Sequence, residues 1–438
     1  MSAAAPSSAA PPLSAALRSF ETEWRARAGD PIAAVRSEAM QRCLRLGLPT
    51  TRDESWRYTN LRWLAAQSYA AARRGADLPA PAIAGIPGIV IANGYPELAD
   101  AADRPTRGVE VRSLRQLVQT DADWVMRRLR PLSDSEHQRW ALLNTALFAD
   151  GLHVKIGSGS NATLLLTHVA DGGAQSAAVH PRMIIESAPG SAATIIEYHV
   201  SGSGGDVLTN SVSQIFLAEA AELRHYRVFA TGAGSSHVDT LEIRQDKDSR
   251  CTQFTICVGG GFVRTTLEAQ LRQSGAVLDS YALLVGHEAR HLDCVNAAVH
   301  AAPNTRSRQT ARAIASGTSR VIFNSKVIVN PGATAAESQQ SCRGLLLAPT
   351  AEIDTRPQLE IRTDEVKCAH GATTGRLDPD MLFYMLSRGI DRATAQSLLV
   401  YAFLADVFTG MSVAEARAAI ETALIAQLPD AERVRAFR

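Results

Sequence analysis

The sequence lacks the features that mark nucleic-acid-binding or membrane-spanning proteins. Its 45 basic and 44 acidic residues give a formal net charge of +1, so it has no basic footprint for phosphate backbones. No uninterrupted apolar run approaches the length of a transmembrane helix. Only 5% of the 438 residues are aromatic, and most of the apolar content is Ala, Val, Leu and Ile. This composition fits stacked thin sheets better than a core of large aromatic side chains. We therefore expect no nucleic-acid partner and no membrane.

The cysteines are too scattered to form a metal site within one segment. They are Cys43, Cys251, Cys257, Cys294, Cys342 and Cys368. No Cys-x-x-Cys pair occurs, which excludes a self-contained zinc ribbon or ferredoxin-type site. Residues 1–12 are rich in Ala, Pro and Ser and lack the pattern of a secretory signal, so we expect a disordered leader. We therefore predict reduced thiols in the cytoplasm. Any metal must be bound jointly, by ligands from distant parts of the chain or from a second subunit.

The common catalytic motifs are also missing. No Gly-x-x-x-x-Gly-Lys-Ser/Thr loop, Gly-x-Ser-x-Gly elbow or His-Glu-x-x-His helix occurs. His287 and His291 fall in strand and turn territory, where their side chains would lie about 13 Å apart, too far for one metal. We expect His180, His199 and His225 to be polar positions of strands rather than ligands. The prediction is a non-enzymatic protein.

Three zones differ in hydrophobic pattern. Residues 13–150 show mainly helical periodicity, whereas residues 151–376 contain many short β-branched runs separated by Gly, Ser, Asn and Asp. No helical insertions separate these runs, so a βαβ sheet is not expected. A sandwich, a propeller and a solenoid remain, and the short strands with irregular turns favour the solenoid.

Residues 377–438 return to helix with clear start signals. Asp378-Pro379 and Asp391 are expected N-terminal caps, and Ser412–Glu415 is a capping box. Because a solenoid exposes sheet edges at its ends, we expect this tail to cap one end. A docking surface for another protein is a compatible alternative.

The segment Val366–Thr373 carries the most specific chemical signal. Cys368 and His370 are two residues apart in a predicted strand, so they share one face. Thiolate sulfur and imidazole nitrogen suit iron and zinc. Two donors leave a metal incompletely coordinated, so further ligands must come from elsewhere in the chain or from a second subunit. The alternative is a buried thiol beside a hydrogen-bonded histidine.

Several segments together resemble the SufB/SufD family of iron–sulfur cluster assembly proteins. They are Ser319–Phe323, Leu345–Leu347, Glu352–Ile361, Val366–Gly375 and Leu382–Ile390, with a weaker match at Trp56–Thr59. The resemblance implies a right-handed parallel β-helix core between N-terminal and C-terminal helical domains. Within the family the chain looks like the SufD branch, because it lacks the N-terminal cysteine motif usual in SufB-like chains.

The resemblance also implies partners and ligands. A SufB subunit would lie beside this chain through the β-helices, and a SufC ATPase would dock on the C-terminal helices, where Phe383, Tyr384, Arg388, Leu398 and Phe403 are candidate contacts. His370, with Cys368 beside it, would ligate iron or a transient iron–sulfur cluster at the SufB interface. Reduced flavin in the complex and a homodimer of the isolated subunit are further implications.

Two other functions are also compatible with the sequence. A β-helix enzyme acting on carbohydrate would need a groove lined with carboxylates and arginines, and the acidic residues do not cluster in that way. A purely structural homodimeric solenoid is the second alternative. Neither accounts for the tail and the Cys-x-His motif as directly as a scaffold subunit for cluster assembly.

Overall fold

The computed structural model describes residues 13–27, 29–75, 83, 86–98, 108–130, 138–173, 175–202, 206–408 and 410–425. The predicted leader, residues 1–12, lies outside this part. Within these ranges, no helix is both long and apolar enough to cross a membrane.

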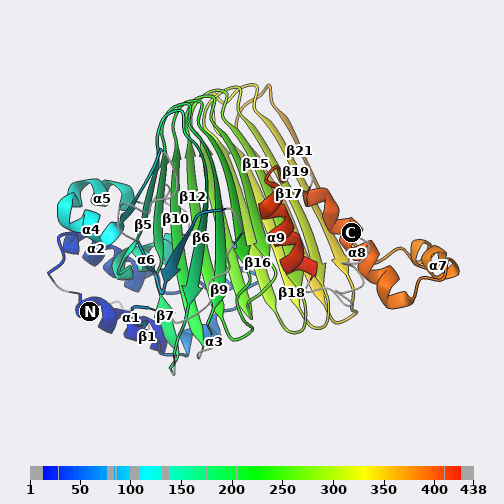
Figure 1. Ribbon diagram of the computed structural model, residues 1–438, viewed down its shortest axis with the longest axis horizontal. Helices are drawn as coiled ribbons and strands as arrows, with labels where there is room; N and C mark the ends of the chain where they lie inside the picture. Colours follow the sequence, from blue (N-terminus) through cyan, green and yellow to red (C-terminus); the bar gives the residue numbers. More distant parts are fainter. Residues whose placement is uncertain are drawn as a thin grey trace, which may run out of the picture.

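The core is a parallel β-solenoid of two facing sheets, which confirms the predicted fold class (Figure 1). We call them sheet A and sheet B. The strands of sheet A are β1 (Ala70–Ala71), β4 (Val109–Ser113), β5 (Gly151–Ile156), β7 (Ala177–Val179), β8 (Arg182–Ser187), β10 (Val207–Leu217), β12 (Ser236–Gln245), β14 (Phe262–Leu271), β16 (His291–His300), β18 (Arg320–Val329) and β20 (Glu352–Ile361). The strands of sheet B are β2 (Gly88–Ala92), β3 (Tyr95–Pro96), β6 (Asn161–Ala170), β9 (Ala192–Ser201), β11 (Glu222–Phe229), β13 (Arg250–Cys257), β15 (Val277–Gly286), β17 (Arg306–Ala315), β19 (Glu337–Leu346) and β21 (Lys367–Gly375). From β8 onward, successive strands alternate between the two sheets.

In-register pairing stacks equivalent residues of successive coils into columns. Leu223, Cys251 and Leu278 form one such column in sheet B. Alternate residues of a strand face the same side, and these three side chains are buried in the apolar cluster between the sheets. The interior of the solenoid is therefore built from such columns. The size of a side chain at one position constrains the packing of the residues above and below it in the same column.

One tight turn of each coil contains a residue with a left-handed backbone. These residues have φ between 52° and 79°, and they are Gly159, Gly190, Ala220, Asp248, Gly275, Asn304, Ala335 and Glu365. Left-handed geometry is costly for residues other than glycine. Backbone hydrogen bonds between coils hold it in place: the Ala220 amide donates to the Lys247 carbonyl at 2.9 Å, and the Asp248 amide to the Ser274 carbonyl at 3.0 Å.

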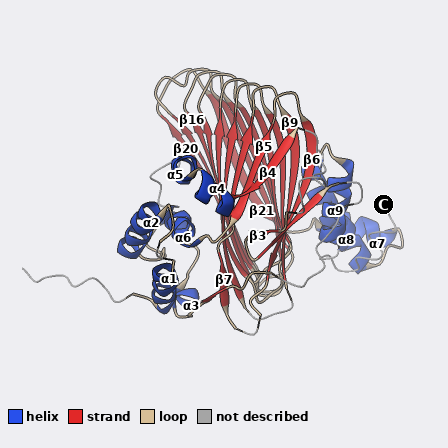
Figure 2. Cartoon of the chain, turned by 60° about the vertical axis from the view of Figure 1, so that its left-hand side comes forward, coloured by secondary structure: helices blue, strands red, loops and turns tan. Residues whose placement is uncertain are grey.

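The N-terminal region, predicted to be mainly helical, places its helices beside sheet A (Figure 2). They are α1 (Ala15–Arg25), α2 (Ala33–Leu46), the 3₁₀ helix η1 (Glu54–Trp56), α3 (Arg62–Ala65), α4 (Leu114–Thr120), α5 (Ala122–Leu129) and α6 (Gln138–Leu147). Helix α6 packs on β10 and β12, with Trp140 and Leu143 in one cluster with Leu208 and Val238. The region also supplies β1 to β4, which extend the two sheets.

The aromatic segment after α2 is anchored on sheet A. The guanidinium of Arg264 lies 3.7 Å from the centroid of the Trp56 ring and pairs with the buried carboxylate of Asp293. The Thr59 hydroxyl donates a hydrogen bond of 2.5 Å to the same carboxylate. This segment therefore has a structural role, because it fastens the N-terminal helices to β14 and β16.

The C-terminal helices are α7 (Pro379–Ser387), α8 (Arg392–Phe408) and α9 (Ala414–Ile425). The predicted caps are confirmed for the first two: Asp378 accepts from the Asp380 amide at 2.8 Å, and Asp391 accepts from the Thr394 amide at 3.1 Å. Side chains of α8 and α9, including Leu404, pack against the outer face of sheet B.

The expectation that this tail caps the end of the solenoid is wrong. On the outer face of sheet B, the rings of Tyr226, Phe254 and Tyr281 are stacked, with centroids 4.8 and 4.7 Å apart. Helices α8 and α9 cover this aromatic ladder, and Figure 1 shows α9 in front of the middle strands rather than beyond β21. The apolar ladder offers more burial than the sheet edge, so the helices fold back along the side of the solenoid.

Candidate functional site

The last coil of the solenoid is open. β20 and β21 are the final strands of sheet A and sheet B, and no described strand pairs with the outer edge of either. All residues of β21 are exposed except the half-buried Cys368. Unpaired strand edges favour pairing with another chain, and solenoids normally protect their ends. This open end is therefore a surface suited to a second protein.

Cys368 and His370 face the inside of the solenoid at this open end. Their parallel partners in β19 are Ser338 and Gln340, both of which are buried between the sheets. Cys368 packs against the interior apolar cluster, whereas His370 is exposed. The structure thus gives the two side chains the common face that their spacing predicts, about 7 Å apart along the strand.

Cys368 differs from the other cysteines in its exposure. All six thiols are free, and only Cys368 is not fully buried. Burial raises the pKa of the Cys43, Cys251, Cys294 and Cys342 thiols to about 12 and that of Cys257 well above its usual range. Burial also raises the pKa of the Cys368 thiol, against a backbone hydrogen bond from Ser338 that lowers it. Since the thiolate is the metal ligand, Cys368 is the one cysteine placed to bind an ion at the surface.

A buried polar column leads to His370. The positions equivalent to His370 in successive coils of sheet B are Gln340, Gln309, Ser280 and Gln253, and all four are buried. The side-chain Oε1 atoms of Gln309 and Gln340 have no hydrogen-bond partner within the described residues. Unsatisfied buried oxygens are costly, so their presence is notable. They keep the interior of the solenoid polar up to the open end, where an ion bound by His370 would have polar neighbours.

The residues predicted to contact a partner fall into two groups. Phe383 and Tyr384 on α7 are 71% and 60% exposed, and the guanidinium of Arg388 lies 5.2 Å from the centroid of the Tyr384 ring. Leu398 and Phe403 on α8 are half-buried, and Phe403 packs against the cluster on sheet B. Figure 1 shows α7 projecting from the solenoid. Adjacent exposed aromatic side chains mark an interaction surface, so α7 is the stronger part of the predicted dock.

A second group of ligating side chains was not predicted from the sequence. His168, Glu197 and His199 converge between the sheets, on β6 and β9, far from β21 in sheet B. The only sequence signal was the Glu-x-His spacing of Glu197 and His199 on one strand face. His168 is far from them in sequence, and only the strand register brings it to the same place.

Comparison with known proteins identifies the class to which this fold and site belong. Residues 152–403 match the family model described as "SUF system FeS cluster assembly, SufBD core domain", and residues 17–164 match "SufBD protein N-terminal region". The chain belongs to the SufB/SufD family of iron–sulfur cluster assembly proteins.

The relatives of this chain include a SufD protein. The chain is 28% identical to the iron-sulfur cluster assembly protein SufD of Escherichia coli (strain K12), over 84% of this chain and 86% of that protein. It is 29% identical to an iron-sulfur cluster assembly SufBD family protein of Synechocystis, over 84% and 85% of the two chains. It is also 29% identical to the chloroplastic protein ABCI7 of Arabidopsis thaliana, over 52% and 48%. The chain is thus a homologue of SufD.

Proposed function

We propose that this protein is a non-catalytic scaffold subunit of a SufB–SufC–SufD complex in the cytoplasm and that it contributes interface ligands for iron or a nascent cluster. The observation that carries the proposal is the open terminal coil, where Cys368 and His370 lie at unpaired strand edges. Two donors at such an edge can complete a coordination sphere only with ligands from a partner. A SufB subunit that continues the two sheets would bring its own ligands to this place.

The second partner surface is α7. Phe383 and Tyr384, together with Met381, form the exposed apolar surface of this helix. We assign Phe383 and Tyr384, with Arg388, to contact with a separate SufC ATPase. We assign Leu398 and Phe403 on α8 to the same dock; both are half-buried, and Phe403 packs against the cluster on sheet B. Binding energy at protein interfaces concentrates in a few aromatic and arginine side chains, and α7 offers that combination.

The carbohydrate-enzyme alternative finds little support in the site. Its chemistry needs paired carboxylates that substrate can reach. The buried carboxylates of Glu197, Asp239 and Asp293 lie inside the fold and are paired with histidine or arginine. The reduced flavin implied by the family resemblance and the homodimer of the isolated subunit stay predictions.

Co-purification tests the proposal. The tagged chain is expressed with SufB and SufC, and the complex is analysed for subunit ratio, iron and acid-labile sulfide. We expect a stoichiometric complex, with His370→Ala leaving the subunit ratio unchanged while iron and sulfide fall to background. Thr373→Ala is the matched control, since Thr373 is an exposed residue on the opposite face of the same strand. A complex that forms without this chain, or one that keeps its cluster in His370→Ala, would contradict the proposal.

A further inference from the structure

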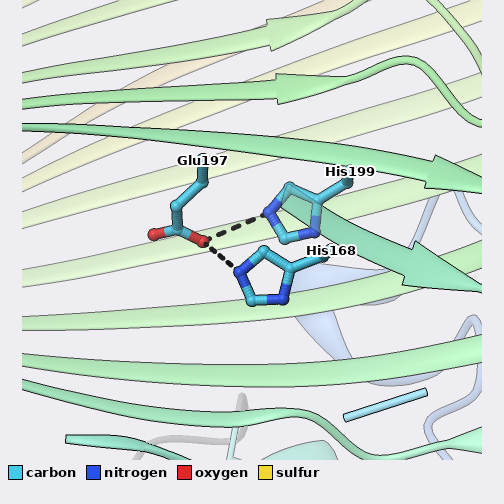
Figure 3. Close-up of side chains that lie close together, drawn as sticks. All are labelled: His168, Glu197 and His199. Atoms are coloured by element: carbon cyan, nitrogen blue, oxygen red, sulfur yellow. Dashed lines mark hydrogen bonds and ion pairs between the residues drawn. The ribbon is translucent and has the colours of Figure 1, made fainter. Parts of the chain in front are cut away.

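Three ligating side chains from two neighbouring strands of sheet B meet inside the solenoid (Figure 3). They are His168 on β6 and Glu197 and His199 on β9. His168 and His199 are parallel register partners, and Glu197 lies two residues before His199 on the same strand face. All three are buried, and His168, the most exposed of them, keeps only 8% of its surface accessible.

The spacing of the three ligand atoms fits coordination of one metal ion. Oε2 of Glu197 is 3.2 Å from His199 Nε2 and 3.5 Å from His168 Nε2, and the three atoms lie within 4.8 Å of one another. Two ligands on a tetrahedral ion with bonds of about 2.1 Å are about 3.4 Å apart. Although buried, His168 Nε2 has no hydrogen-bond partner among the described residues. The 3.5 Å between this nitrogen and Oε2 of Glu197 is long for a hydrogen bond. It matches the distance between two ligand atoms of one metal ion.

The other carboxylate oxygen is held by surrounding groups. His225 Nε2 lies 2.5 Å from Oε1 of Glu197, and Arg227 Nε lies 3.9 Å from the same oxygen. Arg227 is itself paired with Asp239, so its charge is already balanced. This arrangement fixes the carboxylate and leaves Oε2 facing the two imidazoles, as groups around a metal centre orient a ligating carboxylate.

Space for a further ligand lies beside the imidazoles. A cavity of about 10 Å³ is bounded by His168, His199, Thr231 and His237, which is about the volume that one water occupies. Thr231 Oγ1 and His237 Nδ1 are buried and have no hydrogen-bond partner in the described part of the chain. A metal-bound water in the cavity would give these atoms a partner.

We propose that His168, Glu197 and His199 bind one divalent first-row transition metal ion, Fe²⁺ or Zn²⁺, inside the solenoid. Two imidazoles and one carboxylate with an open position are the ligand set of non-haem Fe²⁺ and of many Zn²⁺ sites. The site is separate from Cys368 and His370, because β9 and β21 are six strands apart in sheet B, roughly 29 Å at the usual strand spacing. This assignment replaces the sequence-based expectation that His199 is only a polar strand position.

Metal binding by the full chain tests the proposal. Chelator-treated protein is dialysed against Zn²⁺ alone and, without oxygen, against Fe²⁺ alone, and bound metal is measured by mass spectrometry. The double variant Cys368→Ser with His370→Ala removes the other candidate site, and we expect it to bind one ion per chain as the wild type does. His168→Gln and Glu197→Gln are expected to weaken this binding by about 100-fold or more. His180→Gln, a buried imidazole outside the cluster, is the matched control and should bind normally.

The Co²⁺ absorption spectrum of the double variant gives a second test that does not depend on whether the cluster variants fold. We expect visible bands of a nitrogen- and oxygen-ligated ion and no thiolate charge-transfer band. The proposal is overturned if the double variant binds no ion, if its Co²⁺ spectrum shows thiolate ligation, or if folded His168→Gln retains wild-type affinity. The metal content of freshly purified protein distinguishes iron from zinc, because Zn²⁺ binds more tightly than Fe²⁺ at most nitrogen and oxygen sites whichever metal the protein carries in the cell.

Discussion

Buried neutral histidines should make the stability of this protein fall between pH 7.5 and pH 5.5. Burial lowers the pKa of His180 to about 3 and that of His300 to about 4. The His300 ring lies between two hydroxyl groups, with Nδ1 2.8 Å from Thr305 Oγ1 and Nε2 2.8 Å from Ser307 Oγ. One hydroxyl can donate and the other accept, so the neutral ring is fully hydrogen-bonded without a second proton.

The direction of the effect follows from proton uptake. An imidazole in the unfolded chain has a pKa of about 6.5, so lowering the pH from 7.5 to 5.5 protonates most unfolded rings. The two folded rings stay neutral over the same interval. The unfolded state then binds more protons, and the free energy of unfolding falls with pH. Together the two rings lower it by about 3 kcal/mol.

Urea unfolding of chelator-treated protein at the two pH values measures this effect. The comparison is the double variant His180→Gln with His300→Gln, because glutamine keeps a hydrogen-bonding group but does not titrate. We expect the loss of stability on acidification to be smaller in the variant by about 3 kcal/mol. Each protein is compared with itself at the other pH, so any constant cost of the substitutions cancels. Equal losses in the wild type and the variant would refute the reasoning.

Three further predictions concern the surfaces that hold the molecule and its partners together. Phe383→Ala should weaken SufC binding by about 2 kcal/mol, or roughly 30-fold, in a binding titration. The control is Ala418→Ser, at an exposed position on α9, which should have no effect. Equal affinities of the wild type and Phe383→Ala would remove α7 from the interface. Asp293→Asn should lower the free energy of unfolding by about 3 to 5 kcal/mol, because it leaves the buried Arg264 guanidinium without its counter-charge, and a change below about 1 kcal/mol in urea unfolding would contradict that role. Phe254→Ala should cost about 3 to 5 kcal/mol by opening a cavity in the aromatic ladder under α8 and α9, and calorimetry that shows an unchanged melting temperature would count against this packing.

The solenoid was predictable because its local signals agree with one another. Short β-branched runs without intervening helices exclude a βαβ sheet, and the structure contains alternating strands of two sheets in their place. No sequence repeat was visible, although the left-handed turn residues from Gly159 to Glu365 recur every 27 to 31 residues. Only three of these residues are glycine. The coil repeat is therefore enforced by hydrogen bonds between coils and leaves little trace in residue type.

The position of the C-terminal helices was not predictable in the same way. Their start signals at Asp378 and Asp391 are local and were found. Their location depends on Tyr226, Phe254 and Tyr281, which stack only after three separate strands have come into register. The sequence pattern could show that the tail is amphipathic, but it could not show which face of the solenoid the tail covers.

The two groups of candidate ligands also differ in how much of them the sequence alone could predict. Cys368 and His370 share one strand, so a spacing argument was enough to give them a common face. The exposure of His370 and the open edge beside it required the structure. The buried group of His168, Glu197 and His199 draws on two strands, and its members meet only through the pairing of His168 with His199. No rule of local spacing can identify a register partner 31 residues away.

The most direct test of the central claim is complementation of a strain that lacks this subunit, with the yield of the complex measured in parallel. Because His370 is exposed, replacing it should change stability by no more than about 0.5 kcal/mol, so folding and assembly are expected to persist in every variant. We predict that His370→Ala fails to restore iron–sulfur enzyme activity, that His370→Cys restores part of it because thiolate can replace imidazole on iron, and that Thr373→Ala restores all of it. Full activity of His370→Ala in a normally assembled complex would contradict the account.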